Sequence, residues 1–212
     1  MIDVTHQINA ARRQVGSRVI EVGEAHVVTL SQTYDTTVED LWHACTNPER
    51  LPRWFLPVTG ELRPGGTYQL EGNAGGTVER CDPPKGFTAT WEFDGNVSWI
   101  ELRLSPAAGG GARFELDHIS PDDDPKWREF GPGAVGVGFD MALIGLTLHL
   151  ASGEAVDPQE AMAWFATEEG LRFVTLSSEG WYAASVSDGE AEGVARARAD
   201  RTTAAYTGAE SS

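Results

Sequence analysis

The chain has 212 residues, which is enough for one sizeable domain or for one domain with an appendage. Its 41% hydrophobic and 23% charged residues are typical of a soluble globular protein. With 16 basic against 32 acidic residues, the net charge of -16 repels phosphate backbones and anionic lipid headgroups, which argues against nucleic acids and membrane surfaces as partners.

The composition of the termini and of the apolar segments indicates a compartment. No apolar core segment follows the first charged residues, so no secretory leader is expected. Cys45 and Cys81 lie far apart without a CxxC spacing, as expected for free thiols in a reducing compartment. The apolar stretch 135–150 is shorter than the roughly 20 residues of a membrane span, and Asp140 and His149 interrupt it. We therefore expect a cytoplasmic protein without membrane insertion.

The N-terminal part predicts an arm, a strand and a helix. Residues 1–17 are expected to form an N-terminal arm with weak helical spacing. Residues 18–34 are rich in β-branched side chains and predict one long strand, with Gly23 as the point of a break. Thr36, followed by Glu39 three residues later, has the pattern of a capping box and predicts the start of the first helix.

The middle of the chain changes from helical spacing to alternation. Asn47-Pro48 ends the first helix, and residues 51–56 predict a short helix or turn. Residues 60–119 contain short runs of alternating apolar and polar side chains between turn residues, which predicts an antiparallel meander. Residues 132–150 are apolar almost all round and predict a helix that is covered over most of its circumference.

The composition changes again after Gly153. Asp157, followed by Pro158, predicts the N-cap of a further helix, and Thr167 predicts the start of another. Several large apolar side chains in this region need cover, and burying each contributes roughly 1.5–3 kcal/mol. We therefore expect residues 154–212 to form a helical extension that packs on the core domain or on a second copy of the chain, so a homodimer is one prediction.

Seven short signatures follow one another between Thr36 and Phe139. They are TTVE at 36–39, LPRWFLP at 51–57, LRPGGTY at 62–68, CDPP at 81–84, TWEF at 90–93, ELDH at 115–118 and GVGF at 136–139. In this order they resemble the START-like (SRPBCC) superfamily, which includes Bet v 1 and polyketide cyclases, and within it the branch named after the activator of Hsp90 ATPase. The resemblance implies an α+β helix-grip fold over residues 18–153, in which a curved antiparallel sheet surrounds a long helix and a cavity.

The resemblance also implies a function and a set of site residues. It implies that the chain binds a small apolar or aromatic molecule, lipid-like or polyketide-like, between sheet and helix. The residues expected to contact this molecule are Trp54, Phe55, Tyr68, Trp91, Phe93, Phe114, Leu116, His118, Phe139 and Leu143. Plain core packing is the alternative for the aromatic members.

Two other functions are compatible with the resemblance. One is a polyketide cyclase-, aromatase- or lyase-like enzyme, in which His118 is the candidate acid–base catalyst and Asp117 or Glu115 orients it. For His118, a hydrogen-bonded core histidine is the alternative that we favour. The other is an interaction module like the Hsp90 co-chaperones. We expect a binding protein rather than an enzyme.

No cofactor and no metal are expected. Residues 131–136 match GxGxxG, but no buried strand precedes them, so the glycines are expected instead to let the following helix approach the sheet closely. Asp122-Asp123-Asp124 lacks the glycine and the distal glutamate of an EF-hand loop. The five histidines show neither HxxxH nor HExxH spacing, which argues against zinc.

Overall fold

A computed structural model describes residues 2–208, so the outermost residues of the expected segments 1–17 and 154–212 lie outside the described part. The elements are α1 (Val4–Ala10), β1 (Arg12–Ile20), β2 (Gly23–Tyr34), α2 (Val38–Thr46), the 3₁₀ helix η1 (Leu51–Arg53), β3 (Val58–Gly60), β4 (Thr67–Leu70), β5 (Gly75–Asp82), β6 (Gly86–Phe93), β7 (Asn96–Pro106), β8 (Ala112–Pro121), α3 (Pro125–Phe130), α4 (Gly133–Ser152), α5 (Pro158–Phe165), α6 (Glu168–Ser187) and α7 (Glu192–Thr207).

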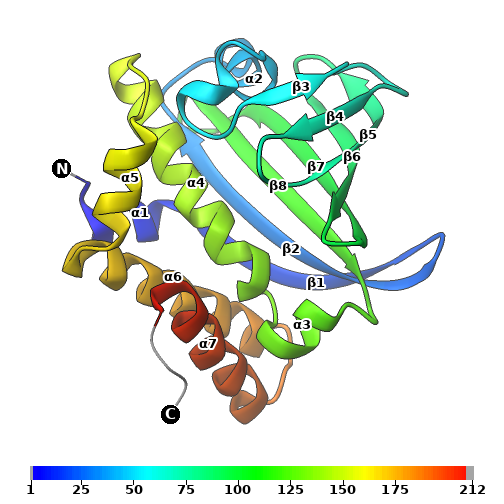
Figure 1. Cartoon of the computed structure of the whole chain (residues 1–212), viewed down its shortest axis with the longest axis vertical. Coiled ribbons are helices and arrows are strands. Elements are labelled where there is room, and N and C mark those ends of the chain that lie inside the picture. Colours follow the sequence, from blue (N-terminus) through cyan, green and yellow to red (C-terminus); the bar gives the residue numbers. More distant parts are fainter. Residues whose placement is uncertain (1, 209–212) are drawn as a thin grey trace. The chain divides into compact units, whose positions relative to one another are not determined.

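The strands form one eight-stranded sheet in the order β1-β2-β8-β7-β6-β5-β4-β3. From β3 to β8, each strand pairs antiparallel with the next one in sequence, and these strands curve visibly in Figure 1. The predicted antiparallel meander and the α+β class are therefore confirmed. The predicted helix at 132–150 is confirmed as α4.

The chain divides into two compact units, and each is described separately below. The first unit comprises the chain up to Leu30, then Pro121–Ile144, and the chain from Asp157 onward. The second unit comprises Ser31–Ser120 and Gly145–Val156. β2 and α4 each continue from one unit into the other, so the units do not follow the sequence segments 1–17, 18–153 and 154–212.

The expected break at Gly23 is confirmed: residues 18–34 hold the end of β1 and all of β2 rather than one strand. Gly23 has a positive φ of 126°, a conformation that favours glycine, and it separates β1 from β2. β1 already begins at Arg12, within the expected arm, and its residues alternate only between exposed and half-buried positions. Because two arginines and a glutamine open this strand, the sequence carries no apolar alternation there that could reveal it.

The predicted capping box of the first helix is wrong by one residue. Thr37, in extended conformation, is the N-cap of α2, and its hydroxyl accepts the Asp40 backbone N–H at 3.1 Å. Thr36 instead donates its hydroxyl to the Asp40 carboxylate at 2.6 Å. Two adjacent threonines can both cap, and the one at which the chain leaves the extended conformation does so.

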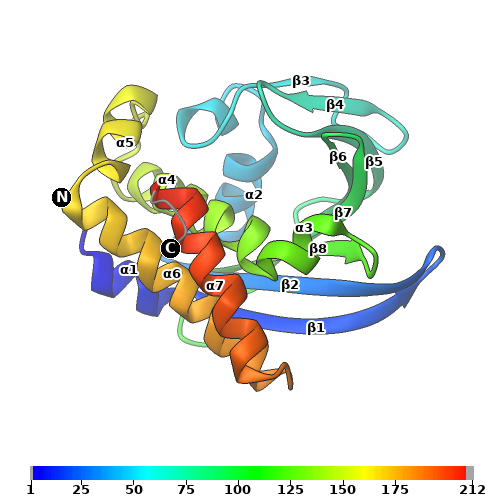
Figure 2. The ribbon, with the colours of Figure 1, turned by 60° about the horizontal axis from the view of Figure 1, so that its bottom comes forward.

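The C-terminal helices bury their large apolar side chains within the first unit. α6 contacts α1 and β1, and Phe173, Val174 and Trp181 on it are at most 2% exposed. α7 lies beside α6 (Figure 2) and also buries residues. The buried residues of α7 are small, namely Ala195, Ala199 and Thr202. The prediction that this region packs on the rest of the chain is confirmed.

The glycines at the start of α4 accommodate helices rather than the sheet. A Cβ at Gly136 would lie 2.3 Å from Cε2 of Trp181 on α6. A Cβ at Gly133 would lie 2.8 Å from the Thr202 side chain on α7. The expectation that these glycines admit the sheet is therefore corrected: in the first unit they let α6 and α7 approach the backbone of α4 closely.

A buried carboxylate holds three segments of the first unit together. Asp140 on α4 is 1% exposed and forms a bidentate ion pair with Arg13 on β1, with both N–O distances 2.8 Å. From α6, the Ser177 hydroxyl donates to it at 2.6 Å and the Trp181 indole N–H at 3.0 Å. Charge-assisted bonds of this kind compensate the desolvation of the carboxylate.

Replacing Asp140 by Ala should strongly destabilise the protein. The substitution leaves the Arg13 guanidinium buried without its counter-charge, which costs about 3–5 kcal/mol. The matched control is Glu61→Ala, because Glu61 pairs with Arg63 where both side chains are mostly exposed and such pairs contribute about 1 kcal/mol or less. Urea unfolding of both variants measures the difference. Equal losses of stability would contradict the role assigned to Asp140.

Truncation after Gly153 should abolish soluble folding. The truncated chain loses Trp181 and Phe173, which α6 buries in the first unit, and exposes the groups that they cover. Truncation after Gly208, the last described residue, is the control and should leave the melting temperature unchanged. Light scattering and thermal unfolding distinguish the two, and a soluble, equally stable chain ending at Gly153 would refute the expectation.

Candidate functional site

One face of the sheet in the second unit is apolar. The register places Ala89 opposite Ile100, and Ile100 opposite His118, so these three residues form one row across β6, β7 and β8. Side chains of directly paired residues lie on the same face. The neighbouring rows of this face are Trp91–Ser98, Phe87–Leu102–Leu116 and Leu104–Phe114. We call this surface the apolar face.

The apolar face is the centre of a hydrophobic cluster. Its buried members are Leu51, Tyr68, Leu70, Val78, Ala89 and Ile100. Partly buried side chains that pack against them are Trp54, Phe55, Leu56, Val58, Cys81, Phe87, Trp91 and Leu116. Protein interiors are close-packed, and large apolar side chains in a finished core are covered. The cluster therefore retains apolar surface that is open to contact.

The segment after η1 brings two aromatic rings to the cluster. The rings of Trp54 and Phe55 stack with centroids 5.5 Å apart. The Trp54 indole N–H donates to the Ala44 carbonyl of α2 at 2.9 Å, which fixes the ring. A Cβ at Gly145 would lie 2.2 Å from the Trp54 carbonyl oxygen, so only glycine lets this segment pass α4 so closely.

His118 is the polar exception on the apolar face. Its side chain is buried, and its Nε2 lies 2.9 Å from the Ser98 hydroxyl. The Ser98 hydroxyl donates its only proton to the Trp91 carbonyl at 3.0 Å, so its oxygen can only accept from His118. We therefore assign the imidazole proton to Nε2. Burial lowers the pKa of His118 to about 4, so the imidazole is neutral at neutral pH.

Asp117 and Glu115 alternate with His118 on β8 and point to the opposite face of the sheet. There the Arg103 guanidinium contacts both carboxylates at 2.9 Å. We call this surface the charged face, and it also carries Glu101. The idea that Asp117 or Glu115 orients His118 is therefore corrected: side chains alternate along a strand, which directs both acids toward Arg103.

A second polar network, which the sequence analysis missed, lies at the ends of α2 and α4. Arg50 donates to the Asp40 carboxylate at 2.5 Å and to Nε2 of His149 at 3.0 Å. Nδ1 of His149 donates in turn to the Glu154 carbonyl at 2.7 Å. The hydrogen bond from Arg50 lowers the pKa of Asp40. No local motif signals this network, since Arg50 and His149 are 99 positions apart.

The structure brings together seven of the ten residues expected at the site. The cluster contains Trp54, Phe55, Tyr68, Trp91 and Leu116. Phe114 and His118 lie on the same face of β8. Phe93, on the same face of β6, is 52% exposed beside the β6–β7 turn, and Phe139 and Leu143 lie on the part of α4 that belongs to the first unit. The expected set omits Phe87 and Ile100, which the same alternation places on this face.

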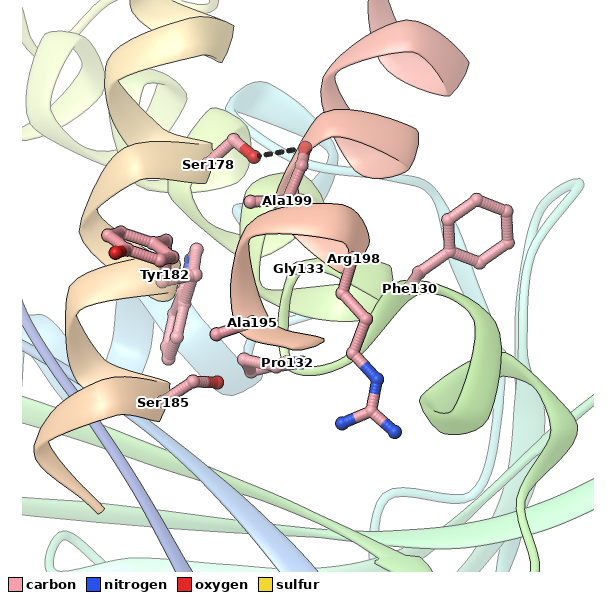
Figure 3. A pocket seen from close by; sticks show the side chains of 10 residues that line it. Phe130, Pro132, Gly133, Ser178, Tyr182, Ser185, Ala195, Arg198 and Ala199 are labelled. Carbon is pink, nitrogen blue, oxygen red and sulfur yellow. Dashed lines mark hydrogen bonds between the residues drawn. The ribbon is translucent and has the colours of Figure 1, made fainter. Parts of the chain in front are cut away.

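Each of the two units contains a hollow among its described residues. Figure 3 shows the first, lined by α6, α7 and the start of α4, where Ser178 donates to the Ala199 carbonyl at 2.9 Å. Its volume of about 10 Å³ is close to that of one water and excludes an organic ligand. The second is an open hollow of about 370 Å³ on β3 to β6, with polar side chains that include Thr67, Gln69 and Glu92.

Candidate metal ligands and candidate membrane-spanning helices are considered for the described residues. Within residues 2–208, no group of three or more His, Cys, Asp and Glu side chains could hold a metal ion. α4 is long and apolar enough to cross a membrane by length and composition, a test that the core helix of a folded domain also passes.

The curved antiparallel sheet, the long helix α4 and the apolar face define an α+β protein of the helix-grip class. The family model of "Activator of Hsp90 ATPase homolog 1-like protein" matches residues 35–150. The chain belongs to this family, and the predicted START-like fold is confirmed. No protein with a curated function matches the chain.

Solved structures of similar proteins have the same fold. The crystal structure of CalU16 from Micromonospora echinospora is 35% identical, with a TM-score of 0.67, and the match covers 82% of this chain and 98% of CalU16. The solution structure of CalU16 is 36% identical, with a TM-score of 0.71, and the match covers 84% and 97%. DynU16 is 16% identical, with a TM-score of 0.55 over 61% of this chain and 48% of its own, which shows the fold alone.

The buried His118 should make stability sensitive to acid. Its folded pKa of about 4 lies below the ordinary value of 6.5, so between these values the unfolded chain binds the proton more readily and stability falls as pH falls. Between about pH 7 and pH 5, the wild type should lose about 2 kcal/mol more unfolding free energy than His118→Gln.

Ser98→Ala is the matched control, because it removes the hydrogen bond at Nε2 and keeps the buried imidazole. Its unfolding free energy should therefore show the same pH dependence as that of the wild type. Denaturant unfolding at several pH values measures all three proteins. Parallel pH profiles for wild type and His118→Gln would contradict a depressed pKa.

Proposed function

We propose that the apolar face binds a small apolar or aromatic molecule, lipid-like or polyketide-like. The observation that carries the proposal is the group of large side chains that pack on one cluster and stay partly exposed, among them Trp54, Phe55 and Trp91. Aromatic side chains supply large contact areas for apolar ligands. The hollow in the first unit is too small for such a molecule, and the hollow on β3 to β6 is lined mainly by polar side chains, with Tyr68 among them.

The acid–base alternative has less support. A general acid or base works best with a pKa near the working pH. Burial lowers the pKa of His118 to about 4, and Asp117 and Glu115 are paired on the charged face. We therefore propose that His118 and Ser98 form a hydrogen-bonded polar pair in the wall of the binding site, and that the protein binds its ligand without transforming it.

Similar proteins are compatible with such a ligand. DynU16 is described as a protein in the dynemicin biosynthetic locus, and the fold that it shares with this chain could therefore serve a natural product. We propose no cofactor, no metal and no nucleic-acid partner, and we place the protein in the cytoplasm. A homodimer stays a prediction, which light scattering of the full chain tests.

The neutral fluorophore N-phenyl-1-naphthylamine should bind the wild-type protein with a rise in fluorescence. Trp91→Ala should weaken this binding by about tenfold or more, because one large aromatic contact contributes more than 1.4 kcal/mol. Val97→Arg changes a side chain that is 46% exposed on the opposite face of the sheet, and it should leave binding unchanged. The proposal fails if the wild type does not bind the fluorophore, or if Val97→Arg alone abolishes binding.

A further inference from the structure

Arg53 is the one lysine or arginine of the second unit that forms no ion pair with a carboxylate among the described residues. The other basic side chains of this unit are each paired with an aspartate or glutamate, namely Arg50, Arg63, Arg80, Lys85, Arg103 and Arg113. The chain has 32 acidic residues against 16 basic ones, so carboxylates are abundant. An exposed guanidinium that pairs with none of them is available to an anion from outside the chain.

Arg53 belongs to the aromatic segment of the candidate site. It is the last residue of η1 and directly precedes Trp54, whose ring stacks on that of Phe55. Consecutive Cα atoms lie about 3.8 Å apart, so the cation and the ring pair start from neighbouring points of the backbone. Both rings pack on the hydrophobic cluster and stay half-buried. A mostly apolar surface with a charged group beside it is the usual composition of a small-molecule site.

Hydrogen bonds hold Arg53 at the C-terminal end of α4. Its guanidinium donates to the Gly153 carbonyl at 2.9 Å, and its backbone carbonyl accepts the Val156 N–H at 2.7 Å. The helix dipole favours a cation beside the last carbonyls of a helix, which explains why this guanidinium is stable without a carboxylate. The bond to Gly153 uses one N–H, and the remaining N–H groups of the planar fork match the two oxygens of a carboxylate.

α4 gives the spacing between the cation and the aromatic pair. A Cβ at Gly145 would lie 2.2 Å from the Trp54 carbonyl oxygen, so the aromatic segment passes α4 at this residue. The guanidinium contacts the same stretch of chain at Gly153. Eight residues of an α-helix rise roughly 12 Å. One elongated organic molecule can therefore reach both the fork and the rings.

We infer that the ligand of the apolar face is a carboxylic acid with an apolar body, whose carboxylate binds the Arg53 guanidinium while the body lies on Trp54 and Phe55. This inference rests on the proposed function and names its ligand class. Arginine recognises carboxylates through two parallel N–H bonds. Because Arg53 is exposed, water screens the ion pair, so Arg53 selects between an acid and a neutral analogue while the apolar contacts supply most of the affinity.

Pyrenebutyrate and its methyl ester test the inference, because they share one fluorescent apolar body and differ in the charge of one carboxyl group. Fluorescence titration gives the ratio of the acid's affinity to that of the ester for each protein. Arg53→Gln should lower this ratio by about threefold or more, the size expected of an ion pair at an exposed site, and should leave the affinity for the ester unchanged. Arg53→Lys keeps the charge without the fork and should lower the ratio less.

Arg63→Gln is the matched control. It removes one positive charge, as Arg53→Gln does, so both variants increase equally the repulsion that the net charge of -16 exerts on an anion. Arg63 pairs instead with Glu61, where both side chains are mostly exposed. The ratio measured for Arg63→Gln should therefore equal that of the wild type.

The outcomes separate the inference from the proposed function. If neither probe binds the wild type, the proposed function fails and the inference fails with it. If the ester binds and Arg53→Gln leaves the ratio unchanged, the proposed function stands and the inference is overturned. The inference is also overturned if Arg53→Gln weakens both probes equally, since Arg53 then only supports the aromatic segment, or if Arg63→Gln lowers the ratio as much. A ratio that falls in Arg53→Gln alone supports the inference.

Discussion

The chemistry of the second unit depends on the alternation of side chains along β6, β7 and β8. Because successive residues point to opposite faces, Ile100 and His118 share an apolar row while Asp117, between His118 and Leu116, reaches Arg103 on the other side. A register shift of one residue would exchange the two faces completely. The antiparallel pairing thus separates an uncharged surface from a dense set of ion pairs within the thickness of one sheet.

The same alternation explains what the sequence could predict. Between residues 60 and 119 the apolar positions recur every second residue, so the strands and the side-chain faces of Trp91 and Leu116 followed from pattern alone. Phe93 continues the pattern but stands beside the turn at Asp94, where it remains 52% exposed. The alternation of apolar and polar residues alone does not indicate at which position of a strand an apolar side chain becomes exposed. The start of β1 was not predicted, because its exposed and half-buried side chains carry no apolar alternation.

Polar pairs between residues far apart in the chain could not be predicted from the sequence. In the sequence Asp140 was only an interruption in an apolar helix, whereas in the structure it pairs with Arg13, 127 positions away. Arg50 and His149 form a second such long-range pair, with 99 positions between them in the sequence. Such pairs depend on which elements meet in space, and neither partner carries a local signature. The sequence could indicate that a charge in α4 needs compensation, but it could not indicate the group that supplies it.

The two faces of the sheet divide charge within the second unit. Glu115 and Asp117 lie on the charged face, where Arg103 pairs with them, whereas the rows of the apolar face given above contain no Lys, Arg, Asp or Glu. A single uncompensated charge placed on the apolar face would lose its hydration without a partner, so an uncharged wall is also the stable one. Selection for a stably folded sheet therefore already favours uncharged side chains in these rows, before any selection for binding acts on them.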